Sequence, residues 1–290
     1  MRQRLKITVI ASLVLLNAAL LFLLNEKMSD SKVPVDDSEL TGTTPTPDSS
    51  PEPKEPGGPQ GIAVANDGTI FRFFAGACAG QVGPGITVST DEGATFAEVA
   101  LPERVRSVFA VTAKNADDIT VIAAGEDCKA QRHVTTDAGA GWRAVKGAGG
   151  WYLHPGTAAV FSPRGKVDPG CTQPVAVGAV SRQRARVFCA SGALVGTADN
   201  GRTWEPMGAL DGAKAGAFPS ANVGYALAPD GGCRTRSFTT ENRGITWTPA
   251  GCLAGGPGRA LAVNGDLLAA IAGDAVFVSE DGGRNWSKTP

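Results

Sequence analysis

Five short stretches of the sequence place an acidic or amide side chain beside a hydroxyl and a glycine. They are STDEGATF (89–96), TTDAGAGW (135–142), TADNGRTW (197–204), TENRGITW (240–247) and SEDGGRNW (279–286). An array of such carboxylates could in principle ligate a cation or carry out acid–base chemistry. We call these five stretches the turn repeats. Whether their acids do chemistry or stabilise structure depends on the elements that hold them.

The order of groups within each turn repeat predicts a tight turn. Asp or Asn folds its side-chain oxygen onto backbone N–H groups, and Gly supplies the positive φ that such turns require. The flanks alternate like strands, as in GITVST before the first repeat and VFVSE before the last. Each repeat is therefore predicted to close a hairpin, with its aromatic residue packing against a neighbouring sheet. These structural positions are Asp91, Gly93 and Phe96; Asp137, Gly139 and Trp142; Asp199, Gly201 and Trp204; Asn242, Gly244 and Trp247; and Asp281, Gly283 and Trp286.

The spacing of the turn repeats indicates a ring of small sheets. The key positions from Asp91 to Asp281 are separated by 46, 62, 43 and 39 residues. A unit of about 40–50 residues suits a four-stranded propeller blade. We therefore expect residues 61–290 to form an all-β propeller of four-stranded antiparallel blades, with five blades favoured and six as the alternative. The longest interval is expected to hold one blade plus an insertion of about fifteen residues, too short for another complete blade.

These stretches resemble Asp-boxes (the BNR repeat), the S/T-x-D-x-G-x-T-W hairpins of sialidase-like β-propellers, over about residues 61–290. The resemblance implies that the boxes lie on blade hairpins away from any catalytic centre, so the acids would stabilise turns. It also implies that enzymatic activity is optional, since non-enzymatic members include photosystem II assembly factors and sortilin-like receptors. A binding or assembly module is therefore the function we expect.

Sialidases of this family resemble one another in an arginine triad, a Tyr nucleophile activated by Glu, an Asp acid and an F/Y-R-I-P motif. The nearest match here, residues 71–74 (FRFF), keeps the arginine and lacks Ile-Pro. Tyr152 has no nearby Glu in the sequence, and we assign Tyr225 to packing. No nucleophile elbow, Walker loop or H-E-x-x-H motif occurs. We predict no catalytic residue and no cofactor, with sialidase-like hydrolysis or carbohydrate binding as the alternative.

The first sixty residues differ in composition from the rest. Residues 1–6 carry three positive charges and no acid, and residues 7–24 form a run of eighteen without charge. As a helix such a run would be about 27 Å long, and its basic flank is expected to stay cytoplasmic. We expect a single-pass signal anchor over residues 7–25, with cleavage and secretion as the alternative. Residues 26–60 are rich in Pro, Ser, Thr and Asp and are expected to form a disordered spacer.

Six cysteines lie beyond this spacer, in a part of the chain expected outside the cytoplasm. An even number of cysteines in an oxidising compartment favours disulfides. We expect Cys171–Cys189 and Cys233–Cys252 as local bridges and Cys78–Cys128 by elimination. No metal site is expected, since no C-x-x-C occurs and the histidines are only His133 and His154.

The sequence offers two candidate partner contacts. The insertion, residues 146–170, places Trp151, Tyr152 and His154 together, either as an exposed hot spot or folded back over the propeller's edge. Arg182, Arg184 and Arg186 alternate, so a strand would present all three on one face, to an acidic partner, a lipid headgroup or solvent. The net charge of −1 gives no basic footprint for nucleic acid. We expect protein partners on the outer, membrane-facing side, with carbohydrate as the alternative ligand.

Overall fold

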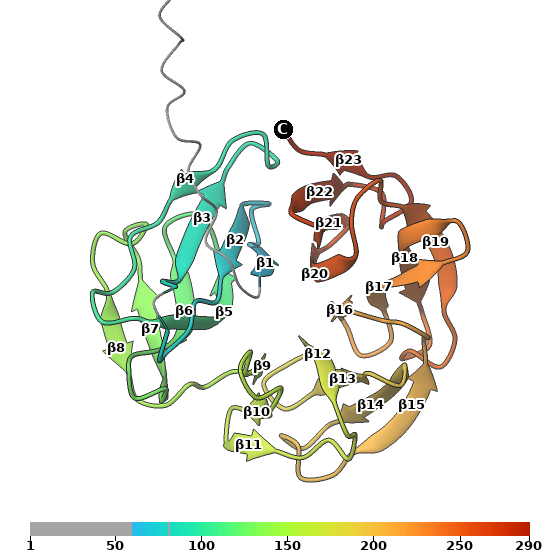
Figure 1. The fold of residues 1–290 in the computed structure, drawn as a ribbon, viewed down its shortest axis with the longest axis horizontal. Helices are drawn as coiled ribbons and strands as arrows, with labels where there is room; N and C mark the ends of the chain where they lie inside the picture. Colours follow the sequence, from blue (N-terminus) through green and yellow to red (C-terminus); the bar gives the residue numbers. More distant parts are fainter. Residues whose placement is uncertain (1–59, 81) are drawn as a thin grey trace, which may run out of the picture. The chain divides into compact units, whose positions relative to one another are not determined.

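The computed structural model describes residues 60–80 and 82–290. Within them the regular structure is entirely β-strand, arranged as six sheets that follow one another along the chain and close into a ring (Figure 1). Strands within each sheet are antiparallel and pair in chain order, and the first strand of each sheet lies nearest the centre of the ring. The described part of the chain is thus a six-bladed β-propeller.

The first two blades comprise β1 (Gln60–Val64), β2 (Ile70–Phe74), β3 (Gly85–Ser89) and β4 (Ala97–Glu98), then β5 (Ser107–Ala113), β6 (Ile119–Ala124), β7 (Ala130–Thr135) and β8 (Arg143–Val145). The third is β9 (Tyr152–Leu153), β10 (Val160–Ser162) and β11 (Gly165–Val167), and the fourth is β12 (Pro174–Ala179), β13 (Ala185–Cys189), β14 (Ala193–Thr197) and β15 (Glu205–Ala209). The last two are β16 (Ala215–Ala217), β17 (Gly224–Asp230), β18 (Cys233–Thr240) and β19 (Thr248–Cys252), then β20 (Gly258–Asn264), β21 (Leu267–Ala272), β22 (Ala275–Ser279) and β23 (Ser287–Lys288).

The hydrophobic core lies between neighbouring blades. Because each sheet is covered on both faces, its second strand is a nearly continuous run of buried residues, as in ARVFC of β13 and LLAAIA of β21. Val187 of β13 faces Trp151 and Val160 of the third blade, whereas Phe188 faces Phe218 of the fifth. Successive side chains therefore bury themselves against opposite neighbours, as the period of a strand requires.

The ring closes by side-chain packing of the last blade against the first. Ile62 and Ile70 of the first blade share a core cluster with Ile271 of the last, and Phe96 packs against the same cluster. Asn264 Nδ2 also donates a hydrogen bond of 2.7 Å to the carbonyl oxygen of Ala65. Within the described residues each sheet keeps its own strands, so the closure depends on these contacts.

The expectation of five blades was wrong, and the difference lies in the long interval before Asp199. The insertion is itself a blade, in which β9, β10 and β11 pair in the order β11-β10-β9. Its strands are two to three residues long, and it carries no turn repeat, so a count of repeats misses it. Large aromatic side chains stabilise this blade despite its short strands, since the rings of Tyr152 and Phe161 stack at 4.8 Å between centroids.

The predicted anchor (7–25), its basic flank (1–6) and nearly all of the predicted spacer (26–60) lie outside the described residues, except that β1 begins at Gln60, one residue before the predicted domain. Among the residues that are described, none forms a helix long and apolar enough to cross a membrane.

Candidate functional site

Each turn repeat is held by one hydroxyl and one carboxylate or amide. In the third repeat Thr197 Oγ1 donates to Asp199 Oδ1 at 2.8 Å and accepts from the Gly201 N–H at 3.0 Å. Asp199 Oδ1 also accepts from the N–H of Thr203 at 3.0 Å. The bonds from the hydroxyl to the acid or amide and from the glycine N–H to the hydroxyl occur in all five repeats. The predicted turns are therefore confirmed.

The backbone of these turns uses two residues of positive φ in succession. The glycines at 93, 139, 201, 244 and 283 have φ of 82° to 92°. The residue before each glycine also has positive φ, although it is Glu92, Ala138, Asn200 and Arg243 in the first four repeats. This second position could not be predicted from the residues, because three of these four residue types rarely adopt the left-handed region. The hydrogen bonds of each turn hold them there.

The acids of the turn repeats are engaged within their own hairpins. The Thr203 N–H lowers the pKa of Asp199 to about 2, and the Asn285 N–H lowers the pKa of Asp281 to about 2. In the first repeat the Thr95 hydroxyl lowers the pKa of Asp91 to about 2. No group of three or more potential metal-ligating side chains occurs within residues 60–80 and 82–290. The acids of the repeats therefore have a structural role, because each carboxylate stabilises its own turn.

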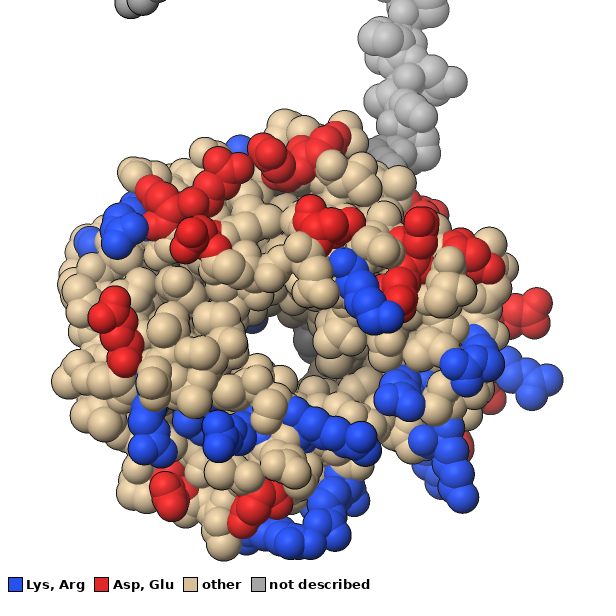
Figure 2. Space-filling model, turned by 180° about the vertical axis from the view of Figure 1, so that it is seen from behind, with Lys and Arg blue, Asp and Glu red and all other residues tan. Residues whose placement is uncertain are grey.

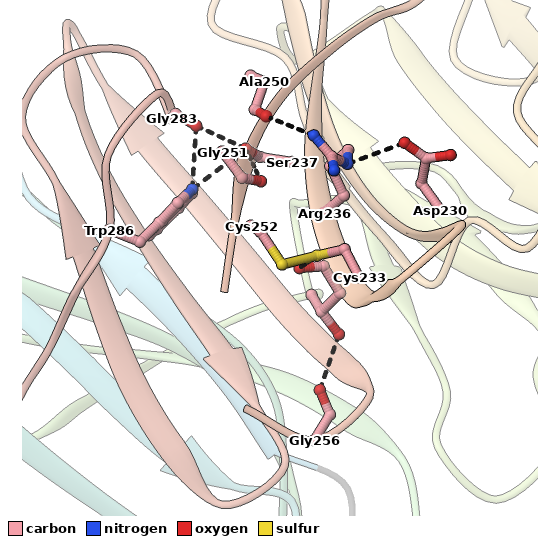
Figure 3. Close-up of a disulfide and its surroundings, with 11 residues drawn as sticks. Asp230, Cys233, Arg236, Ser237, Ala250, Gly251, Cys252, Gly256, Gly283 and Trp286 are labelled. Atoms are coloured by element: carbon pink, nitrogen blue, oxygen red, sulfur yellow. Dashed lines mark hydrogen bonds and ion pairs between the residues drawn. A yellow bond between two sulfur atoms is a disulfide. The ribbon is translucent and has the colours of Figure 1, made fainter. Parts of the chain in front are cut away.

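The aromatic residue that ends each turn repeat contacts the preceding blade. Trp142 of the second blade donates its indole N–H to the carbonyl of Ala100 at 2.8 Å. Trp286 of the last blade donates to Ser237 Oγ of the fifth at 3.1 Å (Figure 3). Trp204 meets Trp151 edge-to-face, and Trp247 and Phe96 pack in the corresponding clusters. The expected packing on a neighbouring sheet is confirmed.

A cavity of about 330 Å³ lies at the centre of the ring, where an opening is visible in Figure 2. Every inner strand contributes to its lining, through Gln60–Ile62, Phe109–Val111, Tyr152–Leu153, Val175–Val177, Ala215–Gly216 and Ala260–Leu261. Because each inner strand is the end strand of its sheet, one edge of its backbone has no strand partner. The channel therefore combines apolar side chains with strand edges that have no strand partner.

The cavity opens on the face of the ring that is opposite the turn repeats. Val64, at the end of β1, pairs with Ile70, which pairs with Ser89 of the first repeat. The lining residues Gln60–Ile62 belong to the start of β1. We call this the channel face and the other the repeat face. The exposed cations Lys214 and Arg259 also line the cavity, and Arg259 forms an ion pair of 3.5 Å with Asp274.

The three aromatic residues proposed as a partner contact are packed within the third blade. Trp151 is 7% exposed and Tyr152 is 4% exposed, so an exposed hot spot does not form and the folded-back arrangement is observed. Trp151 donates its indole N–H to the carbonyls of Ser181 and Arg182, and His154 lies against Phe109. Trp151 and Tyr152 nevertheless belong to the residues that line the channel. They shape the channel wall and do not project from the surface.

Burial argues against a sialidase-like role for the tyrosines. Loss of hydration raises the pKa of Tyr152 to about 12 and also raises the pKa of Tyr225. A nucleophilic phenolate would need the opposite shift. Both faces of the Tyr152 ring are covered, by Phe109 at 5.3 Å and Phe161 at 4.8 Å between centroids, so it offers no platform for a sugar ring.

The three arginines predicted to share a strand face are divided by the fold. Arg182 and Arg184 lie in the turn before β13, and only Arg186 lies in the strand, where it is 4% exposed. Arg184 and Arg186 line one hollow together with Arg243. The prediction of one common face is therefore wrong, because the strand begins at Ala185. The sequence did not bring Arg243 into this group, since it comes from the next turn repeat along the chain.

Charged side chains are spread unevenly over the ring. On the face drawn in Figure 2, acids gather in the upper part, where β1–β4 and β20–β23 lie, and Lys and Arg gather in the lower part, where β9–β15 lie. A hollow between the first and last blades is lined by the acids Asp67, Glu92, Asp266 and Glu280. Different sectors of this face thus carry opposite charge.

Two of the three predicted disulfides are present, Cys171–Cys189 and Cys233–Cys252, each with 5.9 Å between Cα atoms. The second joins β18 to the end of β19, next to the ion pair of Arg236 with Asp230 at 2.8 Å (Figure 3). Cys78 and Cys128 are instead free thiols, which corrects the third pairing. They adjoin each other, and burial together with the Cys128 thiol raises the pKa of Cys78 to about 11, which favours the protonated thiol.

No family model matches the chain, and no curated protein matches it. Solved propeller structures do resemble it. A structure of YCF48 bound to a D1 peptide has 14% identity and a TM-score of 0.32, covering 79% of this chain and 80% of that one. The GH74 enzyme of Niastella koreensis has 17% identity and a TM-score of 0.31, covering 79% and 37%. A mutant Aleuria aurantia lectin in complex with Fucα1-6GlcNAc has 12% identity and a TM-score of 0.48, covering 80% and 94%. At these values no ligand or activity passes from these proteins to this chain.

Proposed function

We propose that this chain is a non-catalytic binding module, an Asp-box propeller tethered outside the cytoplasm, which holds a segment of a protein partner at the mouth of its central channel. The observation that carries the proposal is the channel-face cavity of about 330 Å³, to which all six inner strands contribute. This volume is at the lower end for ligand pockets, and it suits one or two side chains of a partner.

The chemistry of the channel wall supports a protein segment as the ligand. The inner strand edges offer backbone donors and acceptors, which bind an extended chain through main-chain hydrogen bonds. Between them lie apolar side chains such as Val111, Val177 and Leu261. Lys214 adds an exposed cation at the rim, and within the described residues it forms no ion pair. We therefore expect an apolar segment with an acid near it.

The tether and its location belong to the same proposal. Residues 7–25 are proposed to anchor the chain, and residues 26–60 to give it reach toward membrane partners. Two disulfide-bonded cysteine pairs support an oxidising compartment for the propeller. Tethering raises the local concentration of the binding surface without any chemical step.

Site-specific photocrosslinking of the full-length chain in its native membranes tests the proposal. A photoreactive residue in place of Lys214, at the channel rim, should give a discrete crosslinked protein. The matched control places the same residue at Lys166, an exposed position on β11 outside the cavity. The Lys214 crosslink should weaken when Arg259→Glu is introduced at the other exposed cation of the cavity lining. Equal products from positions 214 and 166, or a product that Arg259→Glu leaves unchanged, would remove the channel mouth as the binding site.

A further inference from the structure

A second hollow, of about 350 Å³, lies between the fourth and fifth blades and gathers three arginines. Its lining includes Arg184 from the turn before β13, Arg186 from β13 and Arg243 from the fourth turn repeat. Residues of the third turn repeat, 197–199 and 203, complete its wall, so it lies on the repeat face. It is therefore separate from the channel mouth and does not rest on the function proposed there.

Arg186 is buried without the partners that a buried guanidinium requires. It is 4% exposed, and its Nη1 and Nη2 atoms donate to the carbonyls of Ala185 at 3.1 Å and Ala221 at 3.4 Å. Its Nε atom is buried and makes no hydrogen bond within the described residues. A guanidinium carries five N–H donors. A buried charge without a partner lowers the stability of the fold by roughly several kcal/mol.

The fold reserves space for this guanidinium. Arg186 pairs with Gly178 of β12 and with Gly196 of β14, so glycines flank it on both neighbouring strands. A Cβ atom at Gly196 would lie 2.8 Å from Arg186 Nη1. The glycine thus lets the arginine lie across the sheet, where it lines the hollow.

The acids near the hollow neutralise the arginines only in part. No carboxylate of the described residues forms an ion pair with Arg184, Arg186 or Arg243. Asp199 is engaged by the N–H groups of Arg202 and Thr203 and by two hydroxyls. Burial lowers the pKa of Arg186, the neighbouring charges of Arg243 and Arg184 lower it further, and the charge of Glu205 opposes this shift in part. The arginines therefore repel one another, and the two carboxylates of the lining, Asp199 and Glu205, balance only part of their charge.

We propose that this hollow binds a carboxylate group, with Arg186 at its base and Arg184 and Arg243 at its exposed rim. The planar fork of arginine matches the two oxygens of a carboxylate, and an N–H bond to Nε would satisfy its unpartnered donor. Three arginines against Asp199 and Glu205 leave one excess positive charge among the lining residues, which a monoanion balances better than a phosphate dianion. The side chain of Met207 adds an apolar wall for the remainder of the ligand.

The position of the hollow distinguishes it from a sialidase substrate site. Two turn repeats form its wall, and in the family that these repeats resemble they lie away from the catalytic centre. The proposed group is also bound and released without chemical change. The carboxylate can come from a small free acid or from an Asp or Glu side chain of a peptide, and both sources present the same oxygens.

Calorimetric titration of the full-length protein at constant ionic strength tests the proposal. The ligands are acetate, an acetylated and amidated Gly-Glu-Gly peptide, and inorganic phosphate. Binding of acetate would identify a free acid as sufficient, and binding of the peptide alone would identify a side chain as the source. Arg184→Gln and Arg243→Gln alter exposed residues, and each should weaken the binding roughly tenfold or more. Arg202→Gln is the matched control, an exposed arginine of the third turn repeat outside the hollow.

Gly196→Ala tests the buried arginine without removing its charge, and circular dichroism with the thermal unfolding midpoint would check that the variant folds. In the folded variant a Cβ displaces Arg186 Nη1, so carboxylate affinity should fall as it does for Arg184→Gln. The proposal is overturned if neither acetate nor the peptide binds, or if Arg202→Gln weakens binding as much as the rim variants. Phosphate that binds more tightly than both carboxylates would also overturn it.

Discussion

Replacing Asp199 by Asn should leave the third turn repeat intact at neutral pH and remove part of the acid sensitivity of the fold. The protein contains a natural precedent in its fourth repeat. There Asn242 Oδ1 accepts from the Thr246 N–H at 3.0 Å, while its Nδ2 donates to the Thr246 hydroxyl at 2.8 Å. Asn at position 199 can reproduce these bonds if the Thr203 hydroxyl turns from donor to acceptor.

The size of the effect follows from proton linkage. Hydrogen bonds from Thr203 lower the pKa of Asp199 from 3.8 to about 2, so its stabilising contribution is present above about pH 4 and is lost as the pH falls toward 2. At pH 3 the unfolded carboxyl holds about 0.9 proton and the folded one about 0.1, so unfolding takes up about 0.8 proton at this repeat. Asp199→Asn should remove that uptake.

Urea unfolding, followed by tryptophan fluorescence, measures this proton uptake as the slope of the unfolding free energy against pH. The measurement is made at several pH values from 2.5 to 7 with the disulfides intact. Asn242→Asp is the reciprocal control, because it adds a carboxylate in the same environment and should steepen the slope near pH 3. The reasoning is refuted if Asp199→Asn is as unstable as Asp199→Ala at pH 7. It is equally refuted if the slope near pH 3 is unchanged.

Three further predictions concern the interfaces between blades and the free thiols. Leu194→Ala empties a fully buried position between the fourth and fifth blades and should lower the free energy of urea unfolding by about 2–5 kcal/mol. Ser237→Ala removes a buried hydroxyl that donates to the Gly283 carbonyl at 2.6 Å and accepts from Trp286, and should cost about 1–3 kcal/mol in the same assay. Mild oxidation with oxidised glutathione should join Cys78 to Cys128 as a third bridge, seen by mass spectrometry of proteolytic fragments, because the two thiols adjoin each other.

Each of these has a control in the same chain. Ile245→Ala removes a side chain that is 56% exposed, so a cost equal to that of Leu194→Ala would contradict the packing argument. Ser287→Ala changes an exposed serine on β23. An effect as large as that of Ser237→Ala would contradict the inference that the Ser237 hydroxyl stabilises the contact between blades. For the thiols, recovery of Cys78 bridged to a cysteine other than Cys128 would contradict the observed arrangement.

The turn repeats were predictable because their information is local. A hydroxyl, an acid or amide, a glycine and an aromatic residue within eight positions specify a hairpin and its contact with a neighbouring sheet, and the hydroxyl-to-acid or hydroxyl-to-amide bond occurs in all five repeats. The local pairs Cys171–Cys189 and Cys233–Cys252 were also correctly expected, at separations of 18 and 19 residues. The hydrogen bonds of each turn and the two disulfides join residues of a short stretch of chain, so the chain near them is sufficient to predict them.

The third blade shows where a pattern of repeats stops being informative. Its strands of two to three residues are too short to display an alternation, and they carry no turn repeat. Their pairing is stabilised by contacts with blades on both sides, through Tyr152 toward Phe109 and Trp151 toward Trp204. A segment whose strand character comes from its neighbours cannot be recognised from its own residues.

The sequence by itself determined the class of fold, the turn repeats and the structural role of their acids, because these depend on groups a few residues apart. Only the tertiary structure decided the number of blades, the channel that six inner strands surround, and the meeting of Arg186 with Arg243 across two blades. The physical reason is closure: the width of the ring and the hollows between its blades depend on how all the sheets pack together, and no single segment contains that information.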